Sequence, residues 1–347
     1  MVRLIQIGLG DWGLNWATTI VPQIKTVEVV GYVARSQERA AAARMKLGNH
    51  VAPFFLSLDE AVKRTAPDGV LVFTTTDTHV ELVKRALEFG CHVLVEKPFV
   101  PTVKEGRELV QMAAGRDLIL MVNQNFRFFP AAQRAAGIVR EGTLGGVAAV
   151  SIAFRRLLNY GSEERARRHH ELPHPLLADL GIHHFDLMRM VLGREPISVY
   201  CAAPRASWSA FSDPDTAAAI VMFEGDIAVS WTGSWEARAH TAFSGEWYMQ
   251  CQHGDFTWAC RGDRDVTLDG DRVTVINDQE TFRVEALAKD QRFGRAAVLE
   301  TFAETVAGRK RPSFFPDGSD NLKSLALMEA AIRSYETGNV VKVSSGV

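Results

Sequence analysis

Short apolar runs alternate with amphipathic helical stretches along the first third of the chain. Each run is apolar over most of its length, as a strand buried on both faces of a parallel sheet requires. The expected strands cover residues 2–7, 28–33, 70–74, 93–98 and 118–122, and the expected helices cover residues 14–20, 37–47, 80–89 and a stretch from residue 102. This alternation predicts a doubly wound parallel sheet over residues 1–122.

The pattern changes after residue 123. A helix predicted for residues 130–141 leads into strands separated by turn signals, which together predict a mostly antiparallel sheet. The expected strands cover residues 147–154, 198–202, 217–223, 227–235 and 242–251, and amphipathic helices are expected at 296–307 and 321–335. The sequence therefore predicts an α/β protein in which residues 1–122 form one domain and residues 123–347 form a second, α+β domain.

The amino-acid composition argues against nucleic acid and membranes as partners but does not indicate a particular reaction. The 347 residues contain 39 basic and 41 acidic side chains, so there is no charge excess for nucleic acid or an anionic membrane surface. No apolar run approaches the roughly 20 residues that span a bilayer, and no basic-then-apolar leader precedes the first strand. Four scattered cysteines fit a reducing compartment. We expect a cytoplasmic protein that acts on a small molecule.

A glycine pattern directly follows the first strand, and a helical stretch comes next. In a strand–GxGxxG–helix context the first glycine allows a tight turn, the second lets a pyrophosphate approach the backbone, and the third allows close helix packing. The N-terminus of the helix offers N–H groups to the phosphates. We therefore predict a Rossmann dinucleotide-binding loop, the alternative being a glycine-rich turn in an unrelated α/β domain. Its expected cofactor-binding residues are Gly8, Gly10, Asp11, Trp12 and Gly13.

The end of the second strand bears on the choice of cofactor. A fold that prefers NAD usually places an acid there to bind the ribose 2′-hydroxyl. This chain has Ala34-Arg35-Ser36 instead. Arg35 suits pairing with a 2′-phosphate and Ser36 suits hydrogen bonding to it, although the same residues suit a solvated arginine and the N-cap of the next helix. The sequence favours NADP over NAD.

Further candidates follow the carboxyl ends of other strands, where ligands collect in open α/β sheets. Pro98 ends the pairing of the strand expected at 93–98 and leaves Lys97 at the edge of the sheet. We expect Lys97 to be catalytic and, with Glu96, to contact the cofactor; the alternative is a salt bridge from Lys97 to Glu96 or Asp179. Three more candidates for cofactor contact follow the strand at 70–74, although helix capping also explains the threonines: Thr75, Thr76 and His79.

A helix expected at residues 176–191 carries the second set of candidates. Asp179, His183 and Asp186 are spaced at i, i+4 and i+7, so an α-helix places them on one stripe, whereas His184 shares a stripe with leucines. We expect His184 to pack in the core. His183 is expected to face the substrate as a general acid/base oriented by an acid one turn away, although a helical histidine is often structural.

Five motifs together carry a family resemblance. They are the glycine loop at 8–13, Glu96-Lys97-Pro98, Asn125-Phe126-Arg127-Phe128, Asp179-Leu180-Gly181-Ile182-His183 and the tail at 334–338. Over essentially its whole length the chain resembles the glucose–fructose oxidoreductase / inositol dehydrogenase / MocA (Gfo/Idh/MocA) family. The resemblance implies a Rossmann domain, a second domain with a large open sheet, and homodimers or homotetramers that associate through that sheet.

The resemblance also implies a catalytic triad of Lys97, Asp179 and His183, with Arg127 as a further substrate-binding candidate. These residues suit reversible oxidation of a secondary alcohol on a sugar, polyol or related cyclic substrate. His183 takes the hydroxyl proton as a hydride leaves for the nicotinamide, and Lys97 polarises the same oxygen. Two alternatives stay open: a lyase or glycosidase that acts through transient oxidation, and a dinucleotide-binding protein without turnover.

Two groups of side chains in the second half allow more than one interpretation. Tryptophans at 208, 231, 235, 247 and 258 suit core packing better than stacking on a sugar. A basic, histidine-rich segment before the helix at 176–191 favours an anionic substrate such as a sugar acid. We do not expect a metal site there, because Pro173 disrupts helical ligand spacing. The side chains of this segment are Arg165, Arg167, Arg168, His169, His170 and His174.

Overall fold

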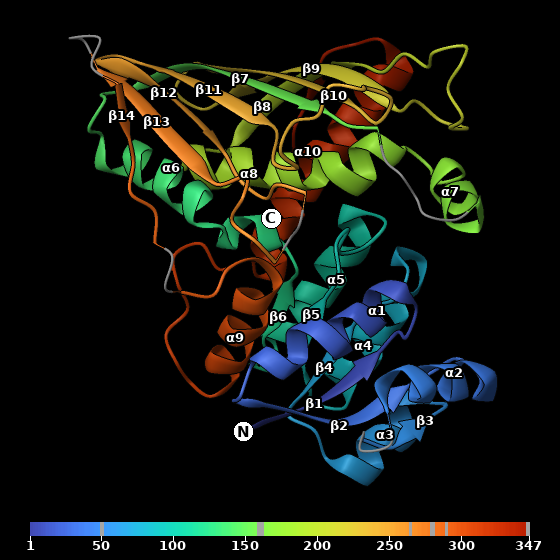
Figure 1. The fold of residues 1–347 in the computed structure, drawn as a ribbon. Helices are drawn as coiled ribbons and strands as arrows, with labels where there is room; N and C mark the ends of the chain where they lie inside the picture. Colours follow the sequence, from blue (N-terminus) through green and yellow to red (C-terminus); the bar gives the residue numbers. More distant parts are fainter. Residues whose placement is uncertain (49–51, 158–162, 264–265, 278–281, 289–290, 345–347) are drawn as a thin grey trace. The chain divides into compact units, whose positions relative to one another are not determined.

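The computed structural model of the protein describes residues 1–48, 52–157, 163–263, 266–277, 282–288 and 291–344. The chain divides into two compact units, drawn in Figure 1. The first consists mainly of Met1–Asn125 and Arg295–Leu322, and the second of Phe126–Gly294 and Lys323–Gly346. Among the described residues, no helix has the length and apolar content that a membrane crossing needs.

A parallel sheet forms the centre of the first unit. In its described part the strand order is β3-β2-β1-β4-β5-β6, the doubly wound order in which ligands bind beside the carboxyl ends of β1 and β4. The strands are β1 (Val2–Ile7), β2 (Val27–Val33), β3 (Phe54–Phe55), β4 (Gly69–Val72), β5 (His92–Val95) and β6 (Leu120–Val122). The helices are α1 (Asp11–Asn15), α2 (Gln37–Leu47), α3 (Leu58–Thr65), α4 (His79–Glu88), α5 (Val103–Ala114) and α9 (Gly294–Val306). The predicted parallel sheet is thus confirmed.

The segment Arg295–Leu322 packs with the first unit, although the sequence assigned it to the second domain. The N–H of Val122 in β6 donates to the carbonyl oxygen of Pro316 at 2.9 Å, and Met121 forms a β-bridge with Asp317. This long-range pairing extends the edge of the parallel sheet. It has no signal in local hydrophobic pattern, which is why the sequence did not reveal it.

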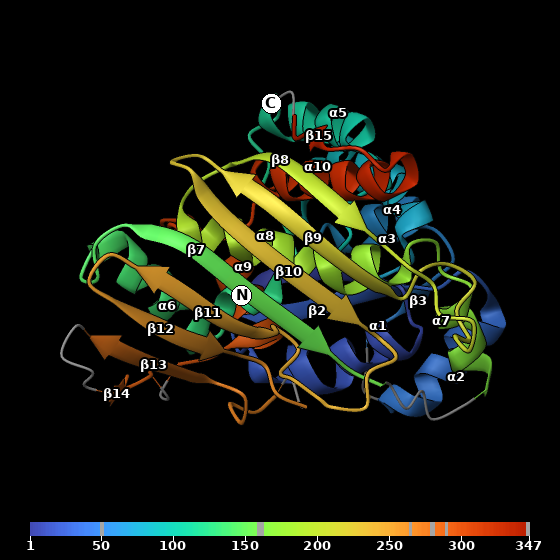
Figure 2. The ribbon, with the colours of Figure 1, turned by 90° about the horizontal axis from the view of Figure 1, so that it is seen from above.

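A second sheet, mixed but mostly antiparallel, forms the centre of the second unit (Figure 2). Its order in the described residues is β14-β13-β12-β11-β7-β10-β9-β8-β15, with β7 and β10 parallel and the other pairs antiparallel. The strands are β7 (Val147–Arg155), β8 (Pro196–Ala202), β9 (Thr216–Phe223), β10 (Ile227–Ser234), β11 (Glu246–Cys251), β12 (Gly254–Ala259), β13 (Arg272–Asn277), β14 (Phe282–Val284) and β15 (Val341–Lys342). The strand expected at 242–251 begins later, because Gly245 turns the chain with φ +78°.

Helices cover one face of this sheet and leave the other face open. The covering helices are α6 (Pro130–Glu141), α8 (Ile182–Leu192) and α10 (Gly318–Thr337), which lie under the sheet in Figure 1, whereas α7 (Glu163–His170) lies to the side. Along β9, buried and exposed side chains alternate, as a half-covered antiparallel sheet requires. A π-helical turn, Leu176–Gly181, leads directly into α8.

Candidate active site

The glycine loop between β1 and α1 has the geometry that its three glycines predict. Gly8 has φ +93°, and a Cβ there would lie 2.2 Å from the carbonyl oxygen of Phe73. A Cβ on Gly13 would lie 2.1 Å from the carbonyl oxygen of Gly8, so the helix approaches the strand as closely as glycine permits. By contrast, apart from Gly10 and its two chain neighbours, no described atom lies within 4 Å of a Cβ built on Gly10. Gly10 therefore borders open space, and the loop fits a pyrophosphate against its backbone.

Buried Glu96 joins this loop to the end of β5. Its carboxylate accepts the indole N–H of Trp12 at 2.6 Å and the side-chain amide of Asn123 at 2.6 Å. The same carboxylate accepts the backbone N–H of Lys97 at 3.0 Å. Glu96, expected as a cofactor contact, is thus the support that connects Trp12 of the glycine loop with Lys97.

A second support for Trp12 comes from the far end of the chain. Arg295, only 2% exposed, places its guanidinium carbon 4.2 Å from the centroid of the Trp12 ring and donates to the side chain of Asn15 at 2.7 Å. Trp12 itself is 41% exposed. Neither Arg295 nor Asn123 was predicted as a residue of this site. Neither lies in a local motif, and the burial of Arg295 is a property of the folded chain alone.

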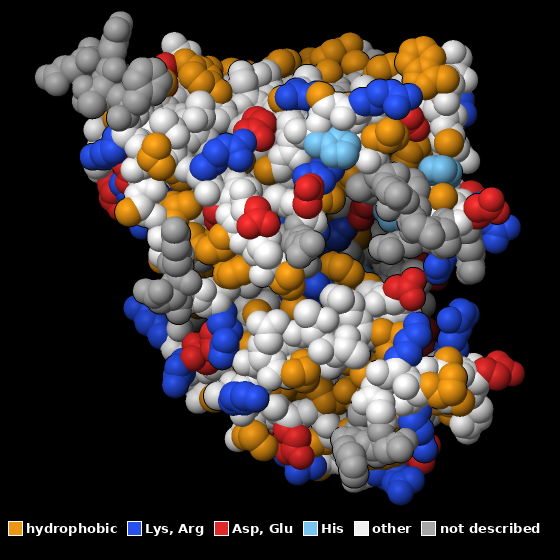
Figure 3. Space-filling model, viewed as in Figure 1, with side chains coloured by type: hydrophobic (Ala, Val, Ile, Leu, Met, Phe, Trp, Pro, Cys, Tyr) orange, Lys and Arg blue, Asp and Glu red, His pale blue; other side chains and the backbone are white. Residues whose placement is uncertain are grey.

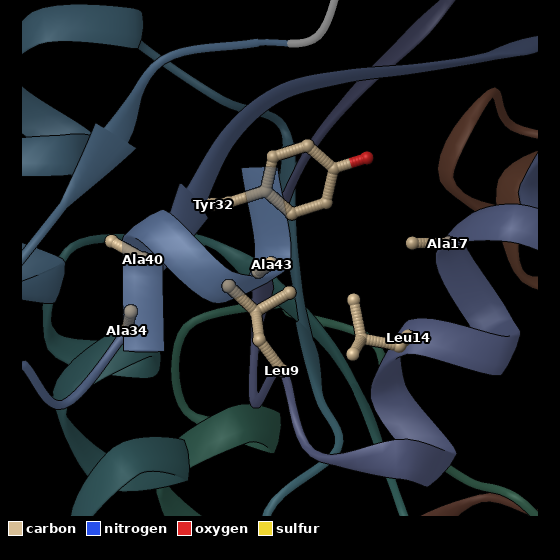
Figure 4. Close-up of a cluster of buried hydrophobic side chains, with 7 residues drawn as sticks. All are labelled: Leu9, Leu14, Ala17, Tyr32, Ala34, Ala40 and Ala43. Atoms are coloured by element: carbon tan, nitrogen blue, oxygen red, sulfur yellow. The ribbon is translucent and has the colours of Figure 1, made fainter. Parts of the chain in front are cut away.

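The position that bears on cofactor choice lies partly in the core. Ala34 belongs to a buried cluster under the glycine loop, shown in Figure 4, with Leu9, Leu14, Ala17, Tyr32, Ala40 and Ala43. The exposed Arg35 follows it, and the Ser36 hydroxyl accepts the backbone N–H of Arg39 at 3.3 Å as the N-cap of α2. An acid at position 34 would face this apolar cluster.

The residues after β4 differ in their environments. Thr75 is exposed and Thr76 half-buried, at a short 3₁₀ turn before α4. His79 is fully buried, with Nδ1 at 3.1 Å from the carbonyl oxygens of Pro98 and Phe99, and Nε2 at 3.2 Å from that of Thr74. Burial lowers the pKa of His79. This histidine connects two loops through backbone oxygens, an arrangement that differs from the cofactor contact expected of it.

The helix that carries Asp179 and His183 is not a regular α-helix at its start. The π-helical turn contains Asp179, and α8 begins just before His183, so the stripe expected from α-helical spacing is interrupted. π-helical turns occur often at functional sites. The Asp179 side chain is 30% exposed, with an oxygen 4.0 Å from Nδ1 of His169 on α7.

The imidazole of His183 is held by stacking. Its ring lies parallel to that of Phe126, with centroids 4.2 Å apart and an interplanar angle of 9°. The guanidinium carbon of Arg261 lies 5.3 Å from the ring centroid of Phe126 and 3.9 Å from that of Phe243. The guanidinium carbon of Arg156 lies 4.1 Å from the Phe243 centroid. This row of aromatic and guanidinium groups fixes the plane of His183, as an acid/base group requires.

Arg127 and Asp186, two residues expected at the site, are paired with each other. Arg127, expected to bind substrate, and Asp186, expected beside His183, form a buried two-pronged ion pair with N···O distances of 2.6 Å. Ser324 of α10 donates to the same carboxylate at 2.9 Å. Because a buried charge without its partner costs about 3–5 kcal/mol, this pair has a structural role in holding α8.

The histidine-rich segment provides no metal site in the described structure. Among the described residues, no group of three or more His, Cys, Asp and Glu side chains is arranged to hold a metal ion. Arg167 and Arg168 are exposed on α7, whereas the side chain of Arg165 lies outside the described residues. Of the five tryptophans in the second half, Trp231, Trp235, Trp247 and Trp258 are core residues, and Trp208 is 80% exposed.

Comparisons with known proteins agree with this architecture. A model described as "Oxidoreductase family, NAD-binding Rossmann fold" matches residues 2–124, and one described as "GFO/IDH/MocA C-terminal domain" matches residues 132–257. The chain is 25% identical to 1,5-anhydro-D-fructose reductase of Ensifer adhaerens, over 98% of this chain and 100% of that protein. It is also 25% identical to inositol 2-dehydrogenase of Rhizobium meliloti, over 80% of this chain and 81% of that enzyme.

Solved structures share the fold along the whole chain. An oxidoreductase from Agrobacterium radiobacter, in complex with NAD⁺, L-tartaric acid and magnesium, superposes with a TM-score of 0.84 at 18% identity, covering 100% of this chain and 99% of that one. A putative NADPH-dependent oxidoreductase from Desulfitobacterium hafniense superposes with a TM-score of 0.84 at 16% identity. The match covers 99% of this chain and 97% of that one. With models for both domains matched in order, the protein belongs to the GFO/IDH/MocA family of oxidoreductases, whose first domain is an NAD-binding Rossmann fold.

Proposed function

We propose that the protein catalyses reversible oxidation of a secondary alcohol on a sugar, polyol or related cyclic substrate. The observation that carries the proposal is the carboxylate of Glu96, which binds both Trp12 of the glycine loop and the backbone N–H of Lys97. A lysine connected in this way to the glycine loop, two residues beyond the parallel strand β5, supports the proposal. The curated relatives named above, a sugar reductase and an inositol dehydrogenase, support the substrate class.

The proposed mechanism assigns one task to each of three side chains. His183, its ring plane held by Phe126, takes the proton of the substrate hydroxyl. The Lys97 ammonium donates a hydrogen bond to the same oxygen and stabilises its developing negative charge. Asp179 orients His183 and accepts a second substrate hydroxyl. When bound, the nicotinamide cofactor supplies the hydride acceptor.

For the cofactor we propose NADP rather than NAD. Ala34 lies in the buried cluster of Figure 4, so the usual acid for the ribose 2′-hydroxyl is missing from its place at the end of β2. The exposed Arg35 next to it suits a 2′-phosphate. Thr75 and Thr76, at the end of β4, are proposed contacts for the rest of the cofactor.

We also propose that the protein self-associates through the open face of its large sheet. Ile220, Tyr200 and Tyr248 project from this face with 48%, 43% and 41% of their surface exposed. Hydrophobic side chains are visible along the top of Figure 3, where this sheet lies. Apolar side chains grouped on an uncovered sheet are typical of an interface.

A substrate panel tests the proposed reaction. Sugars, polyols and sugar acids are assayed with NADP and with NAD by the absorbance of the reduced cofactor, and we expect turnover that is faster with NADP. Lys97→Met and His183→Asn should each lower kcat by about 10²–10⁴-fold, since positioned proton transfer is typically worth that much. Calorimetric affinity of the His183→Asn variant for NADP should equal that of the wild type.

Two results would contradict the proposed function. If Lys97→Met or His183→Asn turned over substrate at the wild-type rate, the substituted residue would have no part in the proposed mechanism. Cleavage of a glycoside without accumulation of reduced cofactor would instead indicate a lyase or glycosidase that uses transient oxidation.

A further inference from the structure

A pocket of about 300 Å³ opens in the second unit, apart from the side chains given tasks above. Trp235 and Phe211, both almost fully buried, line it together with the exposed Trp208. Its polar lining comes from His170 at the end of α7 and from Glu236 after β10. Small-molecule pockets typically span about 300–1,000 Å³, so this one has the size for a single ring.

The loop that presents Trp208 is braced although it contains no helix or strand. The Arg205 guanidinium donates to the carbonyl oxygens of Phe211 at 2.6 Å and Ser209 at 3.3 Å. The Ser209 hydroxyl donates to buried Asp215 and accepts the backbone N–H of Phe211 at 3.1 Å. An exposed tryptophan on a loop held this firmly is preorganised for contact, since little conformational freedom is lost on binding.

The pocket is connected to the segment that leads into the helix of the proposed acid/base. The indole N–H of Trp235 donates to the carbonyl oxygen of Pro175 at 3.4 Å, immediately before the π-helical turn. The backbone N–H of His174 donates to Asp213 of the braced loop at 2.9 Å. His170, which lines the pocket, follows His169, whose Nδ1 lies 4.0 Å from a carboxylate oxygen of Asp179. Two successive residues of α7 thus connect the pocket with Asp179 in the same unit.

The lining chemistry identifies the kind of ligand. The faces of aromatic rings carry partial negative charge and attract the C–H groups of a sugar ring. Glu236 accepts hydrogen bonds from hydroxyl groups and repels anions. None of the described residues that line the pocket is Lys or Arg, and Glu236 adds a carboxylate to the lining. A neutral, hydroxylated ring fits, which differs from the anionic substrate that the basic segment suggested.

We propose that this pocket is a subsite for a second, neutral sugar ring of the substrate. The substrate is then a glycoside or disaccharide, with one ring oxidised at His183 and the other stacked on Trp208. This inference rests on the proposed function and extends it by naming the substrate class.

Matched pairs of neutral substrates test the subsite. Maltose, cellobiose and lactose are compared with glucose and galactose, in the wild type and in Trp208→Ala, Trp208→Phe and Glu236→Gln. We expect the ratio of kcat/KM for the best disaccharide to that for its monosaccharide to fall about tenfold in Trp208→Ala, the scale of one aromatic contact. Trp208→Phe should recover part of the ratio. Val340→Ala, which removes an exposed apolar side chain outside the pocket, is the matched control.

Binding measured without turnover separates this inference from the proposed function. Calorimetric titration of the His183→Asn protein with the same disaccharides should give binding that Trp208→Ala weakens, even if no oxidation is found. If Trp208→Ala changed neither the ratio of kcat/KM for disaccharide over monosaccharide nor the affinity for disaccharides, the subsite would be overturned. Oxidation of monosaccharides in the same assays would show that the proposed function still holds. Tight binding of sugar nucleotides that Trp208→Ala weakens, without binding of neutral disaccharides, would also overturn the subsite.

Discussion

Neighbouring histidines of α8 have different environments. His183 stacks on Phe126, whereas His184 is completely buried between two polar partners. The indole N–H of Trp231 donates to its Nδ1 at 2.8 Å, so its Nε2 carries the proton and donates to the carbonyl oxygen of Phe243 at 2.8 Å. The prediction that His184 packs in the core is confirmed, and the structure adds that it does so as a neutral ring.

The burial of His184 makes the stability of the protein depend on pH. Burial lowers the pKa of His184 to about 4 from the ordinary 6.5. The unfolded chain therefore binds a proton more readily than the folded one. The stabilisation is complete above pH 6.5 and is lost as the pH falls toward 4. Between pH 7.5 and pH 5 we expect the free energy of unfolding to fall by about 2 kcal/mol on account of this residue.

Urea unfolding of wild type and His184→Gln at pH 7.5 and pH 5 measures this contribution. The amide of glutamine retains a donor and an acceptor but does not titrate, so the variant should lose less stability on acidification. His79, whose pKa burial also lowers, leaves a remaining dependence. His253→Gln, at an exposed position, controls for the removal of a histidine. The same loss of stability in wild type and His184→Gln would contradict the assignment.

At the scale of elements, the β1–α1 loop uses its glycines for different physical reasons. Gly13 brings the start of α1 against the carbonyl oxygen of Gly8, and the side-chain amide of Gln6 donates to the carbonyl oxygen of Gly13 at 2.7 Å. Gly10 instead borders open space. The sequence pattern predicts glycine at both places, and the structure gives the two glycines different surroundings, tight packing at Gly13 and open space at Gly10.

Two alanine substitutions distinguish these roles. Gly13→Ala should lower the melting temperature, because its Cβ would meet a backbone oxygen at 2.1 Å. Gly10→Ala should leave the melting temperature unchanged and weaken NADP binding by on the order of tenfold or more, because its methyl group would occupy the space expected for the pyrophosphate. Thermal melting and calorimetric titration with NADP measure the two effects. Equal NADP affinity in wild type and Gly10→Ala would contradict the placement of the cofactor.

At the scale of the whole molecule, the open sheet predicts association. Ile220 lies on β9, between β10 and β8, with its side chain on the uncovered face. Ile220→Lys places a charge on that face and should convert oligomers to a smaller species in light scattering after gel filtration. Val340→Lys, at an exposed position outside the strands, should leave the mass unchanged. A wild-type protein that is monomeric at micromolar concentration would contradict association through this sheet.

The sequence by itself determined both sheets, most helices, the glycine loop and the strand end that carries Lys97. These features depend on residues close together in the chain, where hydrophobic period, glycine and proline act locally. The family resemblance followed from the same short motifs. Even the cap of α2 by Ser36 was visible in advance, since a cap involves only four neighbouring residues.

Only the tertiary structure decided the partners of buried polar groups. Asp186 was expected beside His183 and pairs instead with Arg127, 59 positions away, while Arg295 lies over Trp12. The pocket lined by Trp208 combines residues of a loop, of α7 and of the chain after β10. The burial of charges and the shape of a pocket depend on which distant segments of the chain pack together. A buried charge must be paired, and its partner is set by that long-range packing. The local sequence pattern therefore does not predict the partner.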